Sequence, residues 1–398
     1  MSGGVKFYSY CDSSGYGSSG LAYLRGLLNA GWSVQWVPLV YNGKNFVPLQ
    51  PTENPPLLSL AQGDASLQDL AAIRAATSRP VEYSTVFAQT GPDQWPQFFE
   101  SGKKNVGYTT WEADALPPHW KPWLDLADAI CVPCQLNLRT FEKAHLRPSI
   151  HVIPHIRRHA WNDFTIAELE AMRASLGIPP DHFIFYSINT WDPRKNNIGL
   201  LQSYMQAFSA ESPVTLILKT SKEGYGEAPF YSWQATSDIV SSAMANITSV
   251  TGGTPAQICL LPFELSGRGI DMLHALGDCY VSASRGEGWG MGMFDAATRA
   301  TPVLATGWGG QLDYLGSDWP GAIPFNMHTV PVWPPSAPLF WPPQRWAEPD
   351  SEGMVKAWKN ALADAKYHRA AAQTIAAEIA NRFAEPVITA QLGAVLYA

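Results

Sequence analysis

Residues 279–305 read CYVSASRGEGWGMGMFDAATRATPVLA, which has the layout of a strand, a glycine-rich turn, a helix and a second strand. Cys279–Ser282 and Pro302–Ala305 are the expected strands. Because strands joined through a helix pair in parallel, the stretch predicts one βαβ unit of a parallel sheet. The turn holds Gly288, Gly290 and Gly292, just where the helix should begin.

The same alternation recurs along the whole chain. Further expected strands are Val5–Tyr10, Ser33–Val40, Asn105–Thr109, Ala129–Val132, His151–Ile153, Phe183–Ser187, Val214–Leu218 and Ile258–Leu261. Expected helices include Ile166–Leu176, Glu352–Asp364 and Tyr367–Phe383. Repetition of strand and helix predicts an α/β fold with parallel sheets covered on both faces.

The pattern occurs twice, with a break near residues 155–180, and this predicts two domains in tandem. We expect two Rossmann-like, doubly wound domains, the first at residues 1–165 and the second at 166–375. Residues 376–398 are expected to form a terminal helix that packs back towards the first domain. A chain of 398 residues is long enough for two such cores.

Composition narrows the class of partner. The net charge of −7 disfavours nucleic acid, because a phosphate backbone needs a basic face. No segment resembles a signal peptide or the roughly 18 apolar residues of a membrane span, so we expect a cytoplasmic protein, with weak peripheral association at the inner membrane face left open. The odd number of cysteines, five, fits a reducing compartment. The oligomeric state stays open.

The sixteen tryptophans admit two readings, core packing and stacking on sugar or base rings. Trp111, Trp120 and Trp123 suggest an apolar or sugar-like partner that stacks on them. Residues 317–349 are rich in proline and tryptophan and have no periodic pattern. That segment is too long for an ordinary connection, so it is either a functional loop or an ordered cover.

Two motifs that often carry chemistry are disfavoured. Cys131 and Cys134 have C-x-x-C spacing, but they follow an apolar run instead of opening a helix as a redox pair does. His151, His155 and His159 recur every four residues, but Pro154 would break the helix that such a metal site requires.

The glycine motif near the N-terminus, Gly15-Tyr16-Gly17-Ser-Ser-Gly20, has the G-x-G-x-x-G spacing of a dinucleotide site. A nicotinamide enzyme also needs an acid at the end of the second strand to hold the ribose. The strand Ser33–Val40 offers none. What remains is a helix start at which a ligand can approach backbone N–H groups.

The glycines at 288, 290 and 292 give a stronger signal. Backbone N–H groups at a helix N-terminus carry about half a positive charge and favour a phosphate or diphosphate. Glu287 and Asp295 lie on either side and could accept hydroxyl hydrogen bonds from a sugar and a ribose. Arg194 and Lys195 follow another strand and could neutralise a departing diphosphate. The alternatives are a capped helix with an acidic turn and a solvated basic helix start.

Several stretches together carry a family resemblance. They are SGYGSSGLAYLRGLLNAGWSV (14–34), GYTTWEADALPPHW (107–120), ADAICVPCQLNLRTF (127–141), VIPH (152–155), WDPRKN (191–196), SRGEGWGMGMFDAATRATPVLATGWGG (284–310) and WAEPD (346–350). The chain resembles the retaining glycosyltransferases of family 4, which have the two-domain GT-B architecture. The resemblance implies that the two domains face a cleft, with residues 1–165 forming an acceptor-binding domain and residues 166–375 a nucleotide-sugar-binding domain. The resemblance implies transfer of a sugar, of hexosyl type, from a nucleotide-diphosphate donor to a hydroxyl of a glycan, polysaccharide or lipid-linked saccharide. No cofactor is expected beyond the donor itself, and without a D-x-D acid pair no catalytic metal is expected.

The resemblance also assigns roles to residues. Glu287 would contact the donor sugar, Asp295 the ribose, and Lys195 with the backbone of Gly290–Gly292 the diphosphate. Residues implied to bind the donor are Gly15, Tyr16, Gly17, Asn189, Lys219, Leu265, Arg268, Arg285, Gly288, Trp289, Gly290, Met291, Gly292 and Asp295. Residues implied to act in catalysis are Glu287, Lys195, Arg194 and Glu112. The leaving phosphate oxygen would itself deprotonate the acceptor hydroxyl.

Three positions depart from the family pattern. Asp295 is one methylene shorter than the usual glutamate. Asn189 stands where an arginine is usual, so Arg194, Lys219 or Arg285 would have to meet the diphosphate charge. Trp111-Glu112 replaces a histidine, which makes Glu112 a candidate for contacts near the reacting sugar or the acceptor. Its alternative is a surface acid on a loop. The loss of the arginine keeps a non-catalytic nucleotide-sugar-binding protein as the second hypothesis, ahead of a sugar phosphorylase or an oxidoreductase.

Overall fold

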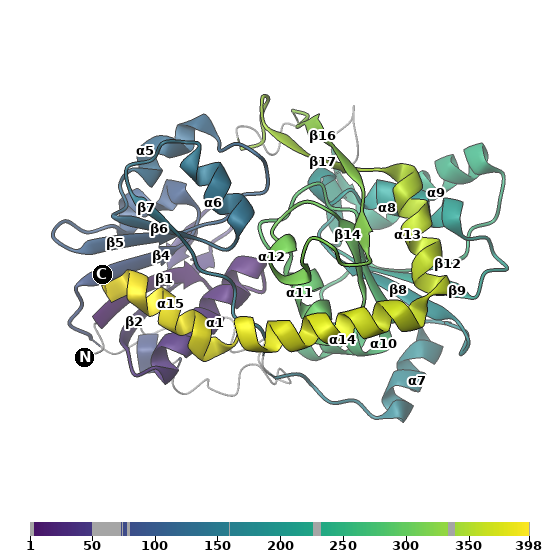
Figure 1. The fold of residues 1–398 in the computed structure, drawn as a ribbon, viewed down its shortest axis with the longest axis horizontal. Coiled ribbons are helices and arrows are strands. Elements are labelled where there is room, and N and C mark those ends of the chain that lie inside the picture. The colour runs from purple at the N-terminus through teal and green to yellow at the C-terminus, as the bar shows by residue number, and fades with distance from the viewer. Residues whose placement is uncertain are drawn as a thin grey trace. The chain divides into compact units, whose positions relative to one another are not determined.

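The computed structural model describes residues 4–49, 73, 75–77, 80–158, 160–225, 232–332 and 339–397. The chain divides into two compact units (Figure 1). Unit 1 comprises Met1–Trp161 and Ile379–Ala398, and unit 2 comprises Asn162–Glu378. The predicted boundaries at residues 165 and 375 lie close to these divisions. Unit 2 is built on a parallel sheet and unit 1 on a sheet that is parallel except for β3 (Phe46–Pro48), so the predicted α/β fold class is confirmed.

Unit 1 holds a seven-stranded sheet in the order β3-β2-β1-β4-β5-β6-β7. Its strands are β1 (Gly4–Tyr10), β2 (Ser33–Tyr41), β3 (Phe46–Pro48), β4 (Thr85–Gln89), β5 (Lys104–Tyr108), β6 (Ala129–Val132) and β7 (Ser149–Val152). All neighbours pair in parallel except β3, which turns back on β2. The strand order reverses between β1 and β4, which is where ligands bind in doubly wound sheets.

Among the described residues of unit 1, the helices with assigned bounds are α1 (Gly15–Asn29), α4 (Trp95–Phe98), α5 (Lys121–Leu124), α6 (Gln135–Glu142) and α15 (Glu385–Tyr397), with short 3₁₀ turns at Pro92–Gln94 and Pro118–Trp120. The terminal helix α15 lies along α1 (Figure 1). Arg25 on α1 pairs with Glu385 at 2.6 Å, and the Thr85 hydroxyl donates to the carbonyl of Leu396 at 3.1 Å. These contacts attach the end of the chain to the first sheet.

Unit 2 holds a six-stranded, all-parallel sheet in the order β12-β9-β8-β13-β14-β15. Its strands are β8 (Phe183–Ile188), β9 (Val214–Lys219), β12 (Gln257–Leu261), β13 (Cys279–Ser282), β14 (Val303–Thr306) and β15 (Ala322–Ile323). Two antiparallel pairs stand apart from it, β10 (Glu223–Tyr225) with β11 (Trp233–Ala235), and β16 (Phe325–Thr329) with β17 (Arg345–Pro349).

The helices of unit 2 are α7 (Ile166–Ser175), α8 (Asn197–Ala207), α9 (Thr236–Thr251), α10 (Gly267–Leu276), α11 (Met291–Thr298), α12 (Leu312–Leu315), α13 (Ser351–Ala363) and α14 (Ala365–Arg382), the last of which continues into unit 1. Successive side chains of a strand point to opposite faces. Accordingly Phe185 packs edge-on against Trp358 of α13 at 4.8 Å, while its neighbour Tyr186 meets the His274 imidazole of α10 at 2.9 Å. Helices therefore cover both faces of the sheet.

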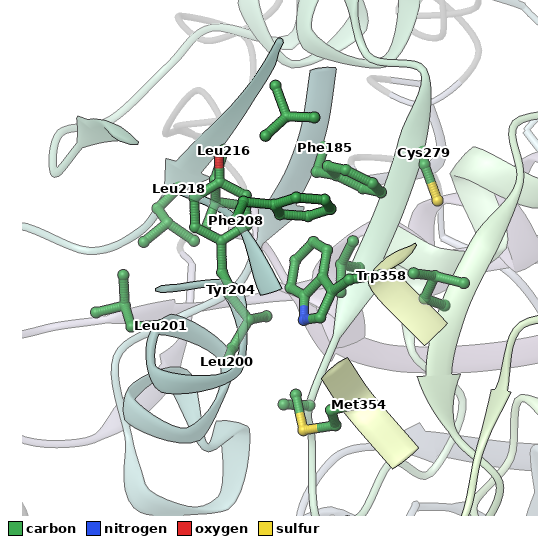
Figure 2. Packing of buried hydrophobic residues seen from close by; sticks show 14 of the residues in the cluster. Phe185, Leu200, Leu201, Tyr204, Phe208, Leu216, Leu218, Cys279, Met354 and Trp358 are labelled. Carbon is green, nitrogen blue, oxygen red and sulfur yellow. The ribbon is translucent and has the colours of Figure 1, made fainter. Parts of the chain in front are cut away.

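The main core of unit 2 surrounds Trp358 (Figure 2). Its indole is 1% exposed and lies among the rings of Phe185, Tyr204 and Phe208. The indole N–H donates to the Ser203 hydroxyl at 2.9 Å, so the one polar atom of this side chain is satisfied. The core thereby joins α13 and α8 to the sheet that carries the candidate site.

The structure differs from the sequence-based expectation in several places, since the short strands β3, β10 and β11 were not predicted. The central strand β4 was not predicted. Part of the segment 317–349 is regular, since it forms β15, β16 and β17, and its residues 333–338 lie outside the described ranges. Trp111 and Trp120 are 2% and 6% exposed and pack edge-on at 4.8 Å. Their proposed part in acceptor stacking is therefore wrong, because core packing already uses both rings.

The histidines of the disfavoured metal motif do not gather around one point. His151 lies on β7 beside the Ser149 hydroxyl at 2.9 Å, whereas His155 is buried against the Tyr23 hydroxyl at 3.2 Å. His159 lies outside the described residues. Within the described part of the chain, no group of three or more His, Cys, Asp and Glu residues is placed to hold a metal ion.

His155 predicts an acid-sensitive unit 1. Burial lowers the pKa of its imidazole to about 3. The unfolded chain binds a proton there below about pH 6.5, and the folded chain does not. The free energy of unfolding should then fall by about 1.4 kcal/mol for each pH unit between these values as the solution is acidified. Denaturant titrations at several pH values in this range give the free energy of unfolding of the wild type and of His155→Gln. If that free energy changes with pH equally in both proteins, the assignment is contradicted.

Candidate functional site

The candidate site forms where the strand order of the second sheet reverses. β8 and β13 are neighbours there, with Cys279 opposite Phe185 and Tyr280 opposite Tyr186. Because the strands are parallel, the loops that follow them leave the same edge of the sheet. The loop after β8 carries Arg194 and Lys195, and the loop after β13 carries Glu287. All of these residues belong to unit 2.

The two cations lie on a 3₁₀ turn, Pro193–Lys195. The Asp192 carboxylate caps this turn by accepting the backbone N–H groups of Arg194 at 3.0 Å and Lys195 at 3.2 Å. Asn196 ends the turn in the left-handed region at φ 53° and begins α8. Proline and aspartate thus specify a short, well-capped turn that presents two neighbouring cations.

Both cations, Arg194 and Lys195, form ion pairs with Glu287. Lys195 Nζ lies 2.6 Å from Oε1, and Arg194 Nη1 lies 3.4 Å from Oε2 and donates to the Gly286 carbonyl at 2.6 Å. The Glu287 side chain is 7% exposed. Burial alone would raise the pKa of Glu287, but Lys195 and Arg194 outweigh it and hold the pKa below its ordinary value. The carboxylate is therefore ionised at neutral pH, and the cluster carries one net positive charge.

A glycine turn leads from Glu287 into α11. Gly290 has φ 85°, a left-handed conformation that a side chain would strain. A Cβ at Gly292 would lie 2.5 Å from the Tyr280 hydroxyl. α11 has no side-chain cap and no acid in its first turn, so its N-terminal N–H groups keep their affinity for an anion. Asp295 lies on this helix, as its spacing from Glu287 predicts.

The sequence did not point to the residues that support this turn. The Tyr280 hydroxyl donates to the Ile188 carbonyl at 3.0 Å, and the Tyr314 hydroxyl donates to the Trp289 carbonyl at 3.1 Å. Gly310 donates its N–H to the Glu287 carbonyl at 2.8 Å and packs so tightly that a Cβ would lie 2.1 Å from the Gly288 carbonyl oxygen. Only the G-W-G-G repetition after β14 could have indicated such close packing.

Several predicted donor-binding residues are placed near the same edge of the sheet. Asn189 follows β8 and donates through its side-chain amide to the Ser187 hydroxyl at 2.9 Å. Lys219 ends β9 and donates to the Thr220 carbonyl at 3.1 Å, and burial lowers the pKa of its ammonium despite Glu264. Leu265 lies before α10 and Trp289 is buried in the turn.

Two predicted donor-binding arginines have other partners. Arg268 pairs with Glu168 of α7 at 2.7 Å and lies over the Phe164 ring. Arg285 pairs with Glu348 of β17 at 2.5 Å. The guanidinium of Arg285 is thus directed at a carboxylate of its own chain, and Arg194 is the arginine that the structure brings to Lys195 and Glu287.

The remaining predicted residues lie in unit 1. Gly15 and Gly17 belong to the first turn of α1, capped by Ser14, whose hydroxyl accepts the N–H of Gly17 at 3.1 Å. Tyr16 bonds the Thr109 hydroxyl at 3.0 Å and accepts the N–H of Thr110 at 3.0 Å. Burial raises the pKa of the Tyr16 phenol. Glu112 follows β5 on the loop after Trp111, and its predicted role stays a prediction.

No protein-family model matches the chain, and no curated protein matches it in sequence. Solved structures do match. They include the sucrose-phosphate synthase of Thermosynechococcus elongatus (14% identity, 99% of this chain and 98% of that one, TM-score 0.61) and Anabaena HepE in complex with UDP-glucose (17%, 99% and 99%, 0.59). A glycosyltransferase of Rickettsia africae is a third (11%, 99% and 98%, 0.62).

These likenesses extend over the whole length of both chains and show the fold. The protein has the GT-B fold of nucleotide-sugar glycosyltransferases, with two Rossmann-like units. The identities of 11–17% lie too low to show membership of a particular family. Within the described ranges, no helix combines the length and the apolarity needed to cross a bilayer.

Proposed function

We propose that the protein is a retaining, metal-independent glycosyltransferase of the family 4 type, which moves a hexosyl group from a nucleotide-diphosphate sugar to an acceptor hydroxyl. The observation that carries the proposal is the cluster of Arg194, Lys195 and Glu287 beside the uncapped N-terminus of α11. Two cations and a helix N-terminus suit a diphosphate, and a buried carboxylate suits the hydroxyls of a sugar.

The proposed chemistry needs little from the protein beyond charge. The bond between the anomeric carbon and the phosphate oxygen breaks, and the bond to the acceptor oxygen forms on the same face. The leaving phosphate oxygen takes the acceptor proton. The configuration is retained because the new bond forms on the face that the diphosphate leaves. Lys195 and Arg194 stabilise the negative charge that grows on the diphosphate, an effect that usually contributes a factor of about 10²–10³ in rate per group.

The donor is the easier substrate to identify. HepE is a structural neighbour that was solved with UDP-glucose, which makes uridine donors the first to test. In a thermal-shift panel of nucleotide sugars, the cognate donor should stabilise the folded state by about 2.7 kcal/mol when present at a hundred times its Kd. Slow release of free nucleotide from that donor, with a chelator present, then tests transferase chemistry and metal independence together.

Two outcomes would turn against the proposal. Stabilisation by a donor without any release of nucleotide, with a range of saccharide acceptors, would favour the non-catalytic nucleotide-sugar-binding protein. Asn189 supports this second hypothesis, because in the sequence it stands where the family resemblance would place an arginine that contacts the diphosphate. A product with inverted anomeric configuration, seen by NMR, would contradict retention. We further propose that the acceptor is a glycan or a lipid-linked saccharide. The same proposal includes a weak peripheral association of the protein with the inner face of the membrane.

A further inference from the structure

The Arg285 side chain lies between three segments that are distant in the sequence. Its Nε and Nη2 pair with the two carboxylate oxygens of Glu348 at 2.5 and 3.0 Å, and Nη1 donates to the carbonyl of Pro193. The guanidinium also lies over the Trp346 ring, 5.6 Å from its centroid. The Arg285 side chain is only 14% exposed.

The backbone repeats the same connections. Arg285 donates its N–H to the Arg194 carbonyl at 2.8 Å, and its own carbonyl accepts the N–H of Ala347 at 2.8 Å. The Ser284 hydroxyl approaches the Arg194 carbonyl at 3.4 Å. The turn with the two cations, the turn with Glu287 and the strand β17 therefore form one hydrogen-bonded block within unit 2.

The orientation of the planar Arg285 guanidinium indicates what this side chain does. A guanidinium is planar and rigid, so a carboxylate that holds two of its N–H groups also fixes where the third nitrogen points. In this structure the third nitrogen points at Pro193, the residue that precedes both cations. Glu348 also partly neutralises Arg285, which leaves Arg194 and Lys195 as the cations that face Glu287.

We propose that Arg285 and Glu348 are positioning residues, which hold the Pro193–Lys195 turn so that Lys195 and Arg194 stay aligned on Glu287. The proposal deepens the proposed transferase function and rests on it for its catalytic consequence alone. The end of the proline- and tryptophan-rich segment 317–349 would then have a structural function, because its strand β17 carries Glu348.

A first experiment measures the position of Lys195 without any nucleotide sugar. Reductive methylation followed by peptide mass spectrometry reports how fast each lysine reacts. In Glu348→Gln the Lys195 side-chain amine should react at least about threefold faster than in the wild type, because the turn opens locally more often. The exposed Lys222 should react at an unchanged rate. The matched control is Glu385→Gln, which alters the similarly shielded Arg25–Glu385 pair of unit 1.

A charge swap separates positioning from simple ion pairing. In the double variant Arg285→Glu, Glu348→Arg the two charges can still attract each other. A carboxylate at position 285 has no N–H for the Pro193 carbonyl, so the swap should leave Lys195 reactive. Melting temperatures close to that of the wild type establish that each variant is folded, and Arg285→Lys, which keeps the charge but lacks the fork, serves as a milder second variant.

Each result has one meaning. Lys195 reacting at the wild-type rate in Glu348→Gln and Arg285→Lys overturns the proposal, as does full restoration by the charge swap. With the cognate donor, the positioning variants should lower kcat by about 10- to 100-fold with a smaller change in the KM for acceptor, as expected when charged groups are misplaced by about 1 Å. If the wild type transfers no sugar while the labelling pattern holds, the proposed function fails and the positioning role stands.

Discussion

Replacing Glu287 or Lys195 by alanine should lower the turnover with the cognate donor by about 10²-fold or more, with the fold intact. In the proposed mechanism Lys195 would supply charge to the leaving diphosphate, and Glu287, whose Oε1 lies 2.6 Å from Lys195 Nζ, would hold the sugar and align Lys195. Steady-state kinetics measure the loss. Lys222→Ala, which removes an exposed lysine of the same unit, is the matched control and should leave turnover unchanged.

Binding of the nucleoside diphosphate should distinguish the two residues, whose alanine variants both lose turnover. Glu287 is an anion that already neutralises the cations a diphosphate would use. Glu287→Gln should therefore bind the nucleoside diphosphate as tightly as the wild type or more tightly, whereas Lys195→Ala should bind it more weakly. Calorimetry with the nucleoside diphosphate gives both constants. Wild-type turnover in both alanine variants, or weaker binding by Glu287→Gln, would refute the assignment of the site.

Trp358→Ala should destabilise unit 2 by about 3–5 kcal/mol, as large-to-small substitutions of buried aromatic residues do. The indole is 1% exposed, contacts the rings of Phe185, Tyr204 and Phe208, and its loss leaves a cavity between α13 and the sheet (Figure 2). Calorimetry is the suitable measurement, because two units can unfold in separate transitions.

The control for that prediction is another tryptophan of the same unit. Trp233 is 56% exposed on β11, so Trp233→Ala should change the free energy of unfolding by no more than about 0.5 kcal/mol. A loss below about 1 kcal/mol in Trp358→Ala would show that the core around it closes over the vacated space.

The sequence allowed much of the fold to be predicted, because its strongest signals are local. Ten predicted strands are present within one or two residues, since short apolar runs bounded by glycine and proline have few alternatives. β4 was missed although all five of its residues are buried, because TVFAQ is short and mixes polar with apolar residues. β16 and β17 were missed because prolines conceal a strand pattern.

The site was predictable to the extent that parallel topology determines it. Arg194 and Lys195 lie on the loop after β8, and Glu287 lies on the loop after the neighbouring parallel strand β13. The three side chains therefore meet although about ninety residues separate them. The role of Arg285 was not accessible, because an arginine next to a glycine turn suggests a phosphate ligand, and only the structure shows that Glu348 pairs with it. Long-range pairing with an irregular segment leaves no periodic signal.

All partners of Glu287 described above come from unit 2, and so does the block that holds its two cations. A chimaera that joins residues 162–378 to a different first domain should therefore keep the preference for the same nucleotide sugar and change the acceptor that is glycosylated. Such a modular division would allow one sugar donor to be used for the synthesis of many different products.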